Sequence, residues 1–332
     1  MNSNQRVMVS IIVPTYNHEK YIAHTLESLL KQETEYQYEI LIGDDASTDN
    51  TVGIIEEYKR KYPQNIRTFY HRVNVGATKN GYTLLKHAKG AYLAFCDGDD
   101  YWTDRERLQR DVDFLQKHLD YAGISNRVCP VNEEGEPLAE ATILATKQFW
   151  NFNKSSFTLK DFENWDMPGH ISALTVRNFM LDKEHDYRIF YRAHPMVGDR
   201  TMVLFTALQG SIFCKEDMVS CYRFRLNGKE NFMSDFETRN LYAKDYLMIR
   251  RLENYSSKEF GISLKADGVK KDRLAAAVVR AMKSKRGSDI KVVMEILRYS
   301  GAPMRYLFYI FKIVLLKNIY WHVYKEDRRI RL

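Results

Sequence analysis

Apolar runs alternate with helical stretches along the first hundred residues. Residues 7–13 form a continuous apolar run, and residues 18–32 then carry apolar side chains at helical spacing. The alternation continues with a strand at 39–42, a helix at 51–62, a strand at 66–70, a helix near 81–88 and a strand that ends at Cys96. Strands that alternate with helices in this way predict an α/β fold with a doubly wound parallel sheet.

Three polar clusters directly follow three of the predicted strands. They are Pro14, Thr15, Tyr16 and Asn17 after the first strand, Asp44 and Asp45 after the second, and residues 97–100 after the last. In open α/β sheets the ligand lies beyond the carboxyl ends of the strands, so the three clusters predict one site. Taken singly, each has a structural alternative, because short polar residues also form turns and helix caps. We favour a functional role for Asp45 and a capping role for Asp49.

The sequence Asp97-Gly98-Asp99-Asp100 places three carboxyl groups at the mouth of a buried strand. Like charges this close raise one another's pKa unless a cation neutralises them. An all-oxygen set suits Mg²⁺ or Mn²⁺ better than zinc, and such an ion keeps positions open for a substrate diphosphate. A solvated acidic turn is the alternative for an isolated Asp-x-Asp. In this context the cluster predicts a divalent-metal site.

The chain is long enough for one large domain and a smaller one. It has 332 residues, of which 45% are hydrophobic. Strand signals stop after Asn227, and helical stretches follow at residues 235–254, 266–282, 290–299 and 304–324. We therefore expect a catalytic domain over residues 1–227 and a helical region over residues 228–332.

The positive charge of the chain gathers near its end. The net charge is +7, and residues 303–332 hold seven basic and two acidic residues among aromatic side chains. An apolar helix flanked by basic and aromatic residues favours peripheral contact with an anionic membrane surface. Packing on the catalytic domain or on a second subunit, as in a homodimer, is the alternative. No run of about 18 uninterrupted apolar residues is present to span a membrane.

Several other classes of protein are disfavoured. The four cysteines form no C-x-x-C pair and the first residues lead straight into a strand, so we expect a reduced, cytoplasmic protein. Membrane contact through the basic tail would place it at the inner face of the plasma membrane. The glycines form neither G-x-G-x-x-G nor a P-loop, which argues against a dinucleotide-binding dehydrogenase and a P-loop NTPase. No nucleic-acid partner is expected.

Four segments together resemble family 2 glycosyltransferases of the GT-A fold. They are VSIIVPTYNHEKYIAHTLESLLKQ, YEILIGDDASTDNT, NVGATKNGYTLLKHAKGAYLAFCDGDDYW and VGDRTMVLFTALQG. The resemblance implies a doubly wound mixed sheet and an inverting, metal-dependent transfer of sugar from a nucleotide-diphosphate sugar, most often a UDP-sugar. The acceptor would be a hydroxyl of a glycan or lipid-linked intermediate in cell-surface polysaccharide synthesis. Without a Q-x-x-R-W element, we expect one sugar per encounter.

The resemblance also assigns roles to residues at the predicted sheet edge. Thr15 and Tyr16, with Pro14 and Asn17, would hold the nucleotide, and Asp45 would accept a hydrogen bond from the base. Asp97 and Gly98 would face the ribose and metal region, with Asp99 as the principal metal ligand. Lys79 stands where the family usually has an arginine near the diphosphate, and it lacks the planar guanidinium fork.

Three further residues are assigned to the sugar and acceptor side. By resemblance, Asp100 and Trp102 would line the donor-sugar and acceptor pocket. His170 lies where family members shape the acceptor side, although a lone histidine near a turn is also a common structural residue.

The attacking hydroxyl needs a base within hydrogen-bond reach, since its own pKa lies far above 7. Asp199 is the candidate, in Val197-Gly198-Asp199-Arg200 before an apolar helical stretch. A simple helix N-cap is the structural alternative. The family often has Glu-Asp at this point, where this chain has Gly-Asp.

Two other functions fit the same motifs. One is a catalytically silent partner subunit that has kept only the nucleotide-sugar pocket. The other is a nucleotidyltransferase on a related sheet, which would release diphosphate rather than a nucleoside diphosphate.

Overall fold

The computed structural model describes residues 6–138, 153–224, 241–284 and 286–299. The chain divides into two compact units, residues 1–227 and residues 228–332. The helix expected at 304–324, with the basic segment that follows it, lies outside the described residues. So does the first part of the stretch expected at 235–254.

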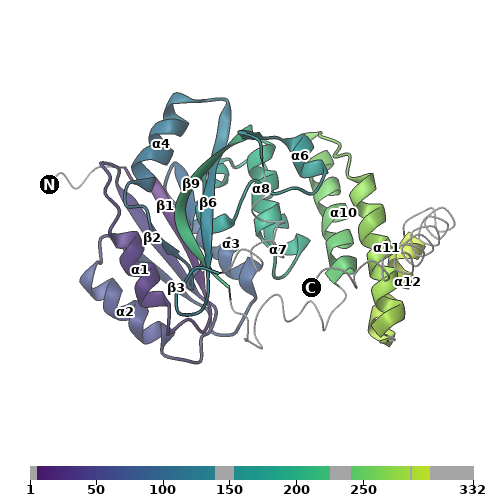
Figure 1. Ribbon diagram of the computed structural model, residues 1–332, viewed down its shortest axis with the longest axis horizontal. Helices are drawn as coiled ribbons and strands as arrows, with labels where there is room; N and C mark the ends of the chain where they lie inside the picture. The colour runs from purple at the N-terminus through teal and green to yellow at the C-terminus, as the bar shows by residue number, and fades with distance from the viewer. Residues whose placement is uncertain (1–5, 139–152, 225–240, 285, 300–332) are drawn as a thin grey trace, which may run out of the picture. The chain divides into compact units, whose positions relative to one another are not determined.

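The first unit is built on a sheet with nine strands among its described residues, in the order β3-β2-β1-β4-β8-β6-β9-β5, with β7 paired to β9 (Figure 1). The strands are β1 (Val9–Thr15), β2 (Tyr38–Asp44), β3 (Ile66–Tyr70), β4 (Tyr92–Phe95), β5 (Tyr101–Trp102), β6 (Tyr121–Val131), β7 (Ser156–Phe157), β8 (Leu174–Arg177) and β9 (Ser211–Arg223).

Helices connect these strands and cover both faces of the sheet. They are α1 (Ile22–Leu30), α2 (Thr51–Lys61), α3 (Ala77–His87), α4 (Arg107–Lys117), α6 (Leu159–Glu163), α7 (Ile189–Ala193) and α8 (Asp199–Ala207), with short 3-10 turns at Ile171–Ala173 and Phe179–Leu181. The strand–helix alternation predicted for the first hundred residues is confirmed.

The side chains of β1 alternate between the two faces of the sheet. Val9, Ile11 and Val13 belong to a buried core that also contains residues of α1, α2 and α4. Ile12 points to the opposite face, where it lines a cavity together with Leu85 of α3. Side chains of a strand alternate between faces, so one apolar run serves both layers.

The predicted parallel sheet is found in the strands from which it was predicted, and later strands make the sheet mixed. β3, β2, β1 and β4 are parallel, whereas β8 runs antiparallel to β4, with Ala94 opposite Thr175. The turn at Ile171–Ala173 leads directly into β8 at the carboxyl end of β4, so β8 can only run back along it. The mixed sheet implied by the resemblance is confirmed.

The second unit, as far as it is described, consists of α10 (Leu241–Phe260), α11 (Asp267–Ser284) and α12 (Gly287–Tyr299). Their shared core includes Tyr246, Leu274, Ala277 and Ile296. The helices predicted at 266–282 and 290–299 are confirmed. Within the described ranges, no helix combines the length and the apolar character needed to cross a membrane.

Candidate active site

The loops after β1 and β2 lock together at the carboxyl edge of the sheet. The Asn17 amide donates to Ser47 Oγ (2.9 Å), and Asn17 Oδ1 accepts from the Thr48 amide (2.8 Å). Asn17 and Ala46 both have left-handed backbone, with φ of 54° and 63°. Asn17 thus holds the loop's shape, while the neighbouring Tyr16 is 39% exposed and presents its ring to solvent.

Asp45 fixes the start of α3. It is buried, and its two carboxylate oxygens accept from the amides of Val75 (2.7 Å) and Gly76 (2.9 Å). Gly76 has a φ of 92°, which favours glycine. Lys79 follows on the first turn of α3 and is exposed.

Residues 97–100, here called the acidic loop, approach β1 closely because residue 98 is glycine. A Cβ atom at residue 98 would lie 2.7 Å from Thr15 Oγ1 and 2.7 Å from His18 Nδ1. Thr15 Oγ1 and His18 Nδ1 are 3.1 Å apart, and His18 Nε2 is 3.7 Å from Asp99 Oδ2. His18 therefore links the loop after β1 to Asp99, the predicted metal ligand. Sequence reasoning missed it, although it directly follows the polar run 14–17.

Asp100 faces inward. It accepts hydrogen bonds from the Ser172 hydroxyl and from the Arg223 amide (3.0 Å), and it is almost fully buried. The Arg223 side chain donates from Nε to the Asp99 carbonyl (2.8 Å) and stacks 4.6 Å from the Tyr21 ring centroid. These contacts hold Asp99 and Asp100 in place from the protein interior.

Trp102 and His170 both form hydrogen bonds with the backbone of Ser172, whose hydroxyl donates to Asp100. Trp102 Nε1 donates to the Ser172 carbonyl (3.1 Å), and the Arg107 guanidinium lies 4.1 Å from its ring. His170 Nδ1 accepts from the Ser172 amide (3.2 Å). Burial lowers the pKa of His170 to about 4, so the imidazole is neutral at neutral pH.

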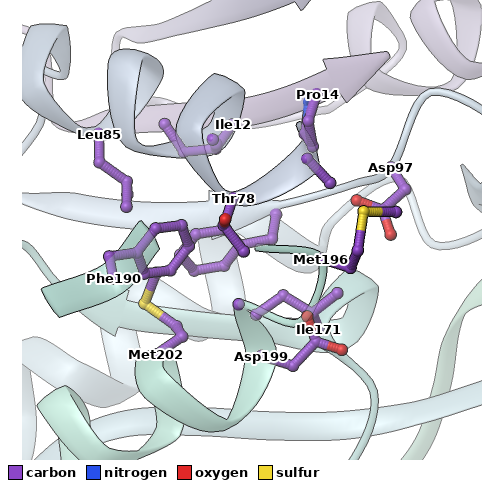
Figure 2. A pocket seen from close by; sticks show the side chains of 14 residues that line it. Ile12, Pro14, Thr78, Leu85, Asp97, Ile171, Phe190, Met196, Asp199 and Met202 are labelled. Carbon is purple, nitrogen blue, oxygen red and sulfur yellow. The ribbon is translucent and has the colours of Figure 1, made fainter. Parts of the chain in front are cut away.

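A cavity of about 130 Å³ opens beside the acidic loop (Figure 2). Among the residues predicted for the site, Pro14, Asp97 and Asp199 line it. The other predicted residues lie outside its lining: Thr15, Tyr16, Asn17, Asp45, Lys79, Gly98, Asp99, Asp100, Trp102 and His170. Asp97 follows β4 and Asp199 begins α8, so the fold brings two distant carboxylates to one space.

The loop before Asp199 is fastened to its surroundings. His194 Nδ1 accepts from the amides of Met196 (3.1 Å) and Val197 (3.0 Å). The Pro195 carbonyl accepts from Thr78 Oγ1 of α3 (2.8 Å). Asp199 is therefore held against α3 rather than left on an unrestrained loop.

The surroundings of Asp97 and Asp199 destabilise the ionised forms of their carboxyl groups. Burial raises the pKa of Asp199. Burial, together with the charges of Asp100, Asp199 and Asp99, raises the pKa of Asp97 well above its ordinary value. A bound cation would reverse this repulsion.

The donor set fits a cation that shares its coordination with substrate. Within the part of the chain that the structure describes, no three His, Cys, Asp or Glu side chains form a metal-binding group. A cation held by Asp97 and Asp99 would take its remaining ligands from phosphate and water. Mg²⁺ is commonly bound in this way, through one or two carboxylates and substrate phosphates.

The packing around Gly198 explains why this chain has Gly-Asp where the family often has Glu-Asp. A Cβ at residue 198 would lie 2.7 Å from Phe190 Cζ, so the ring of Phe190 occupies the space that a side chain would need. Sequence reasoning did not select Phe190, because an isolated apolar residue carries no chemical signal.

The chain is similar to several known proteins. The family model "Glycosyl transferase family 2" matches residues 10–186. Rv1520, an uncharacterized protein of Mycobacterium tuberculosis, is 34% identical over 58% of this chain and 49% of its own. Staphylococcus aureus TarS, a poly(ribitol-phosphate) beta-N-acetylglucosaminyltransferase, is 35% identical over 42% of this chain and 25% of its own.

A solved structure supports the fold. The mannosyltransferase PcManGT of Pyrobaculum calidifontis, in complex with GDP-Man and Mn²⁺, matches with a TM-score of 0.50 and 15% identity over 98% of this chain and 83% of that one. This chain spans about half the length of the first curated relatives it matches.

The matched region covers more than half of the chain, and the chain belongs to glycosyl transferase family 2. The family and the GT-A fold class predicted from the sequence are confirmed.

Proposed function

We propose that this protein is an inverting, metal-dependent glycosyltransferase that moves one sugar from a nucleotide-diphosphate sugar to a hydroxyl group. The proposal rests on the positions of Asp97, which follows β4, and Asp199, which begins α8. Both residues line one cavity. A donor placed with its diphosphate at Asp97 and Asp99 would bring its anomeric carbon towards Asp199.

Asp199 is the proposed general base. As the acceptor oxygen bonds to the anomeric carbon, its proton passes to the Asp199 carboxylate and the nucleoside diphosphate leaves from the opposite face of the sugar. Displacement in line gives inversion. The loop that binds Asp199 to α3 serves this step by holding the carboxylate in one place.

Asp97 and Asp99 are the proposed metal ligands, for Mn²⁺ or Mg²⁺. When bound, the ion would neutralise charge on the departing diphosphate. His18 would keep the Asp99 carboxylate oriented, and Arg223 would hold its backbone.

The nucleotide would lie on the loops after β1 and β2. Tyr16 offers an exposed ring for stacking, and Asp45 keeps the neighbouring loop in shape. We propose a UDP-sugar as donor. Lys79, exposed on α3, would contribute positive charge near the diphosphate.

A glycan or lipid-linked acceptor is proposed, in cell-surface polysaccharide synthesis. Support comes from the relatives, which include TarS and a putative teichuronic acid biosynthesis glycosyltransferase of Bacillus subtilis, TuaG. We further propose a cytoplasmic enzyme that contacts the inner membrane face through residues 303–332. Co-sedimentation with anionic vesicles, compared between the full chain and a chain ending at residue 302, tests that contact.

The experiment that tests the function is a panel of nucleotide sugars with and without Mn²⁺. A true donor raises the apparent melting temperature in the presence of metal, because only the folded state binds it. Product analysis with a cell-envelope acceptor fraction should show release of a nucleoside diphosphate. Release of diphosphate would instead identify a nucleotidyltransferase, and binding without any turnover would indicate a silent subunit.

A further inference from the structure

The cavity has two chemically different ends (Figure 2). Asp97 and Asp199 lie at one end, and Leu85, Phe190 and Met202 gather at the other. The other apolar residues of the lining are Ile12, Pro14, Ala77, Phe95, Ile171 and Met196.

The apolar end offers little to a sugar hydroxyl. Apart from the two carboxylates, Thr78 supplies the remaining polar side chain of the lining, and its hydroxyl already donates to the Pro195 carbonyl (2.8 Å). A hydroxyl placed among Leu85, Phe190 and Met202 would lose its hydrogen bonds to water without replacement. A methyl group there would instead remove apolar surface from water.

The size of the cavity suits a substituent rather than a second ring system. Its volume is about 130 Å³, part of which adjoins the carboxylates. For comparison, an apolar cavity of about 150 Å³ in another protein holds one benzene molecule. A methyl or acetyl group fits the apolar end, whereas a nucleoside does not.

Two glycines set the position of the Phe190 ring and so the shape of the apolar end. A Cβ at Gly81 would lie 3.3 Å from Phe190 Cε1, and one at Gly198 would lie 2.7 Å from Phe190 Cζ. The ring packs into space that side chains at either position would take. Gly81, Phe190 and Gly198 all line the cavity.

We propose that this apolar end selects a donor sugar that carries a methyl-terminated substituent, either an acetamido group or the methyl of a 6-deoxy sugar. The inference rests on the proposed function, because it places the sugar ring between Asp97 and Asp199. The acetamido group has one further partner available, since the Thr78 oxygen retains lone pairs that can accept an amide N–H.

The test measures affinity in matched donor pairs. UDP-N-acetylglucosamine against UDP-glucose reports the acetamido group, and dTDP-6-deoxyglucose against dTDP-glucose reports the deoxy methyl. Titrations with Mn²⁺ include UDP and dTDP alone as references for the nucleotide. Burial of one methyl group is expected to favour the substituted member of a pair by about fourfold or more.

A variant narrows the apolar end without breaking the fold. In Gly81→Ala the new methyl meets Phe190 at a distance that pushes the ring by a few tenths of an ångström, and alanine is the better helix former. The preference within the favoured pair should fall about fourfold or more, while affinity for the free nucleotide, which does not enter the apolar end, stays unchanged. Lys86→Ala, exposed near the end of the same helix, is the matched control and should keep the preference.

The outcomes separate this inference from the proposed function. Preference for a substituted donor in either pair, lost in Gly81→Ala and kept in Lys86→Ala, supports the inference and shows which substituent is selected. Equal affinity within both pairs, with nucleotide binding intact, overturns the inference and leaves the proposed function standing. A preference that Gly81→Ala does not change would also overturn it. Absence of any nucleotide or donor binding would overturn both.

Discussion

Asp97 and Asp199 line the same cavity, although one follows strand β4 and the other begins helix α8. They also interact electrostatically, since the charge of Asp199 raises the pKa of Asp97. Both carboxylates are thus held in a place that destabilises their charged forms. Such an arrangement is typical of functional sites, where stability is given up for chemistry.

Asp97→Asn should stabilise the metal-free protein while it weakens metal-dependent donor binding. The folded-state pKa of Asp97 lies above its unfolded value, so the stability it contributes is fully present below the unfolded pKa and lost as pH rises through the folded pKa. At neutral pH the neutral amide removes this cost. We expect on the order of 1 kcal/mol, or about 2–4 °C in melting temperature.

Thermal unfolding in chelator-treated buffer measures this effect. As pH rises from the ordinary pKa of an aspartic acid through the raised folded-state pKa, the wild type should lose stability, and Asp97→Asn should lose less. Asp120→Asn, at an exposed position, serves as the control. A lower melting temperature for Asp97→Asn at pH 8 would contradict the electrostatic account.

The pH profile of transfer should show an acid limb set by Asp199. Its raised pKa means that the carboxyl stays protonated to a higher pH than an ordinary aspartic acid, and a protonated carboxyl cannot accept the acceptor's proton. The initial rate at saturating donor should therefore rise with pH through this pKa. A rate that stays flat as pH falls to the ordinary pKa of an aspartic acid, measured together with circular dichroism to show that the protein remains folded, would exclude Asp199 as the base.

Gly98→Ala should disturb the site more than its size suggests. The new methyl would lie 2.7 Å from atoms of Thr15 and His18, so the acidic loop must move away from β1. We expect a loss of about 1–3 kcal/mol in stability and weaker metal-dependent donor binding.

Gly268→Ala is the matched control for that substitution. Among the described residues, no atom beyond its own helix backbone and chain neighbours lies within 4 Å of the Cβ position at residue 268 in α11, so stability should change little or rise slightly. Denaturant melts and donor titrations of both variants make the comparison. Equal behaviour of the two would show that close approach at Gly98 is unimportant.

Restoring the second acid of the family pattern should fail in this chain. Gly198→Glu puts a side chain into the space of the Phe190 ring, which displaces either the ring or Asp199. Activity should fall about tenfold or more, because small displacements of a catalytic group are costly. The double variant Gly198→Glu with Phe190→Ala should recover part of the loss, and the rates of the four proteins form a double-mutant cycle. Additive effects would show that the two positions are not coupled.

The sheet edge was predictable from sequence because its signals are local. Apolar runs mark the strands, and polar residues directly after them mark the loops, so Pro14, Asp97 and Asp99 could be selected without coordinates. Asp199 came from its resemblance to a family motif, and its place in the cavity depends on the fold.

The rest could not be read from the sequence for physical reasons. The reversed direction of β8 depends on its pairing with β4, a non-local pairing. The inward bonding of Asp100 depends on Ser172 and Arg223, which lie far along the chain. Phe190 matters through its shape against Gly81 and Gly198, and residue type alone does not reveal shape.

The most direct test of the central claim compares Asp199→Asn with the wild type in donor binding and in turnover. Asparagine keeps the size of the side chain but cannot take the acceptor's proton, so the rate of nucleoside diphosphate release should fall about 10²–10⁴-fold, while the Kd of the donor with Mn²⁺ stays within about threefold of wild type. Transfer at the wild-type rate by Asp199→Asn would contradict the account.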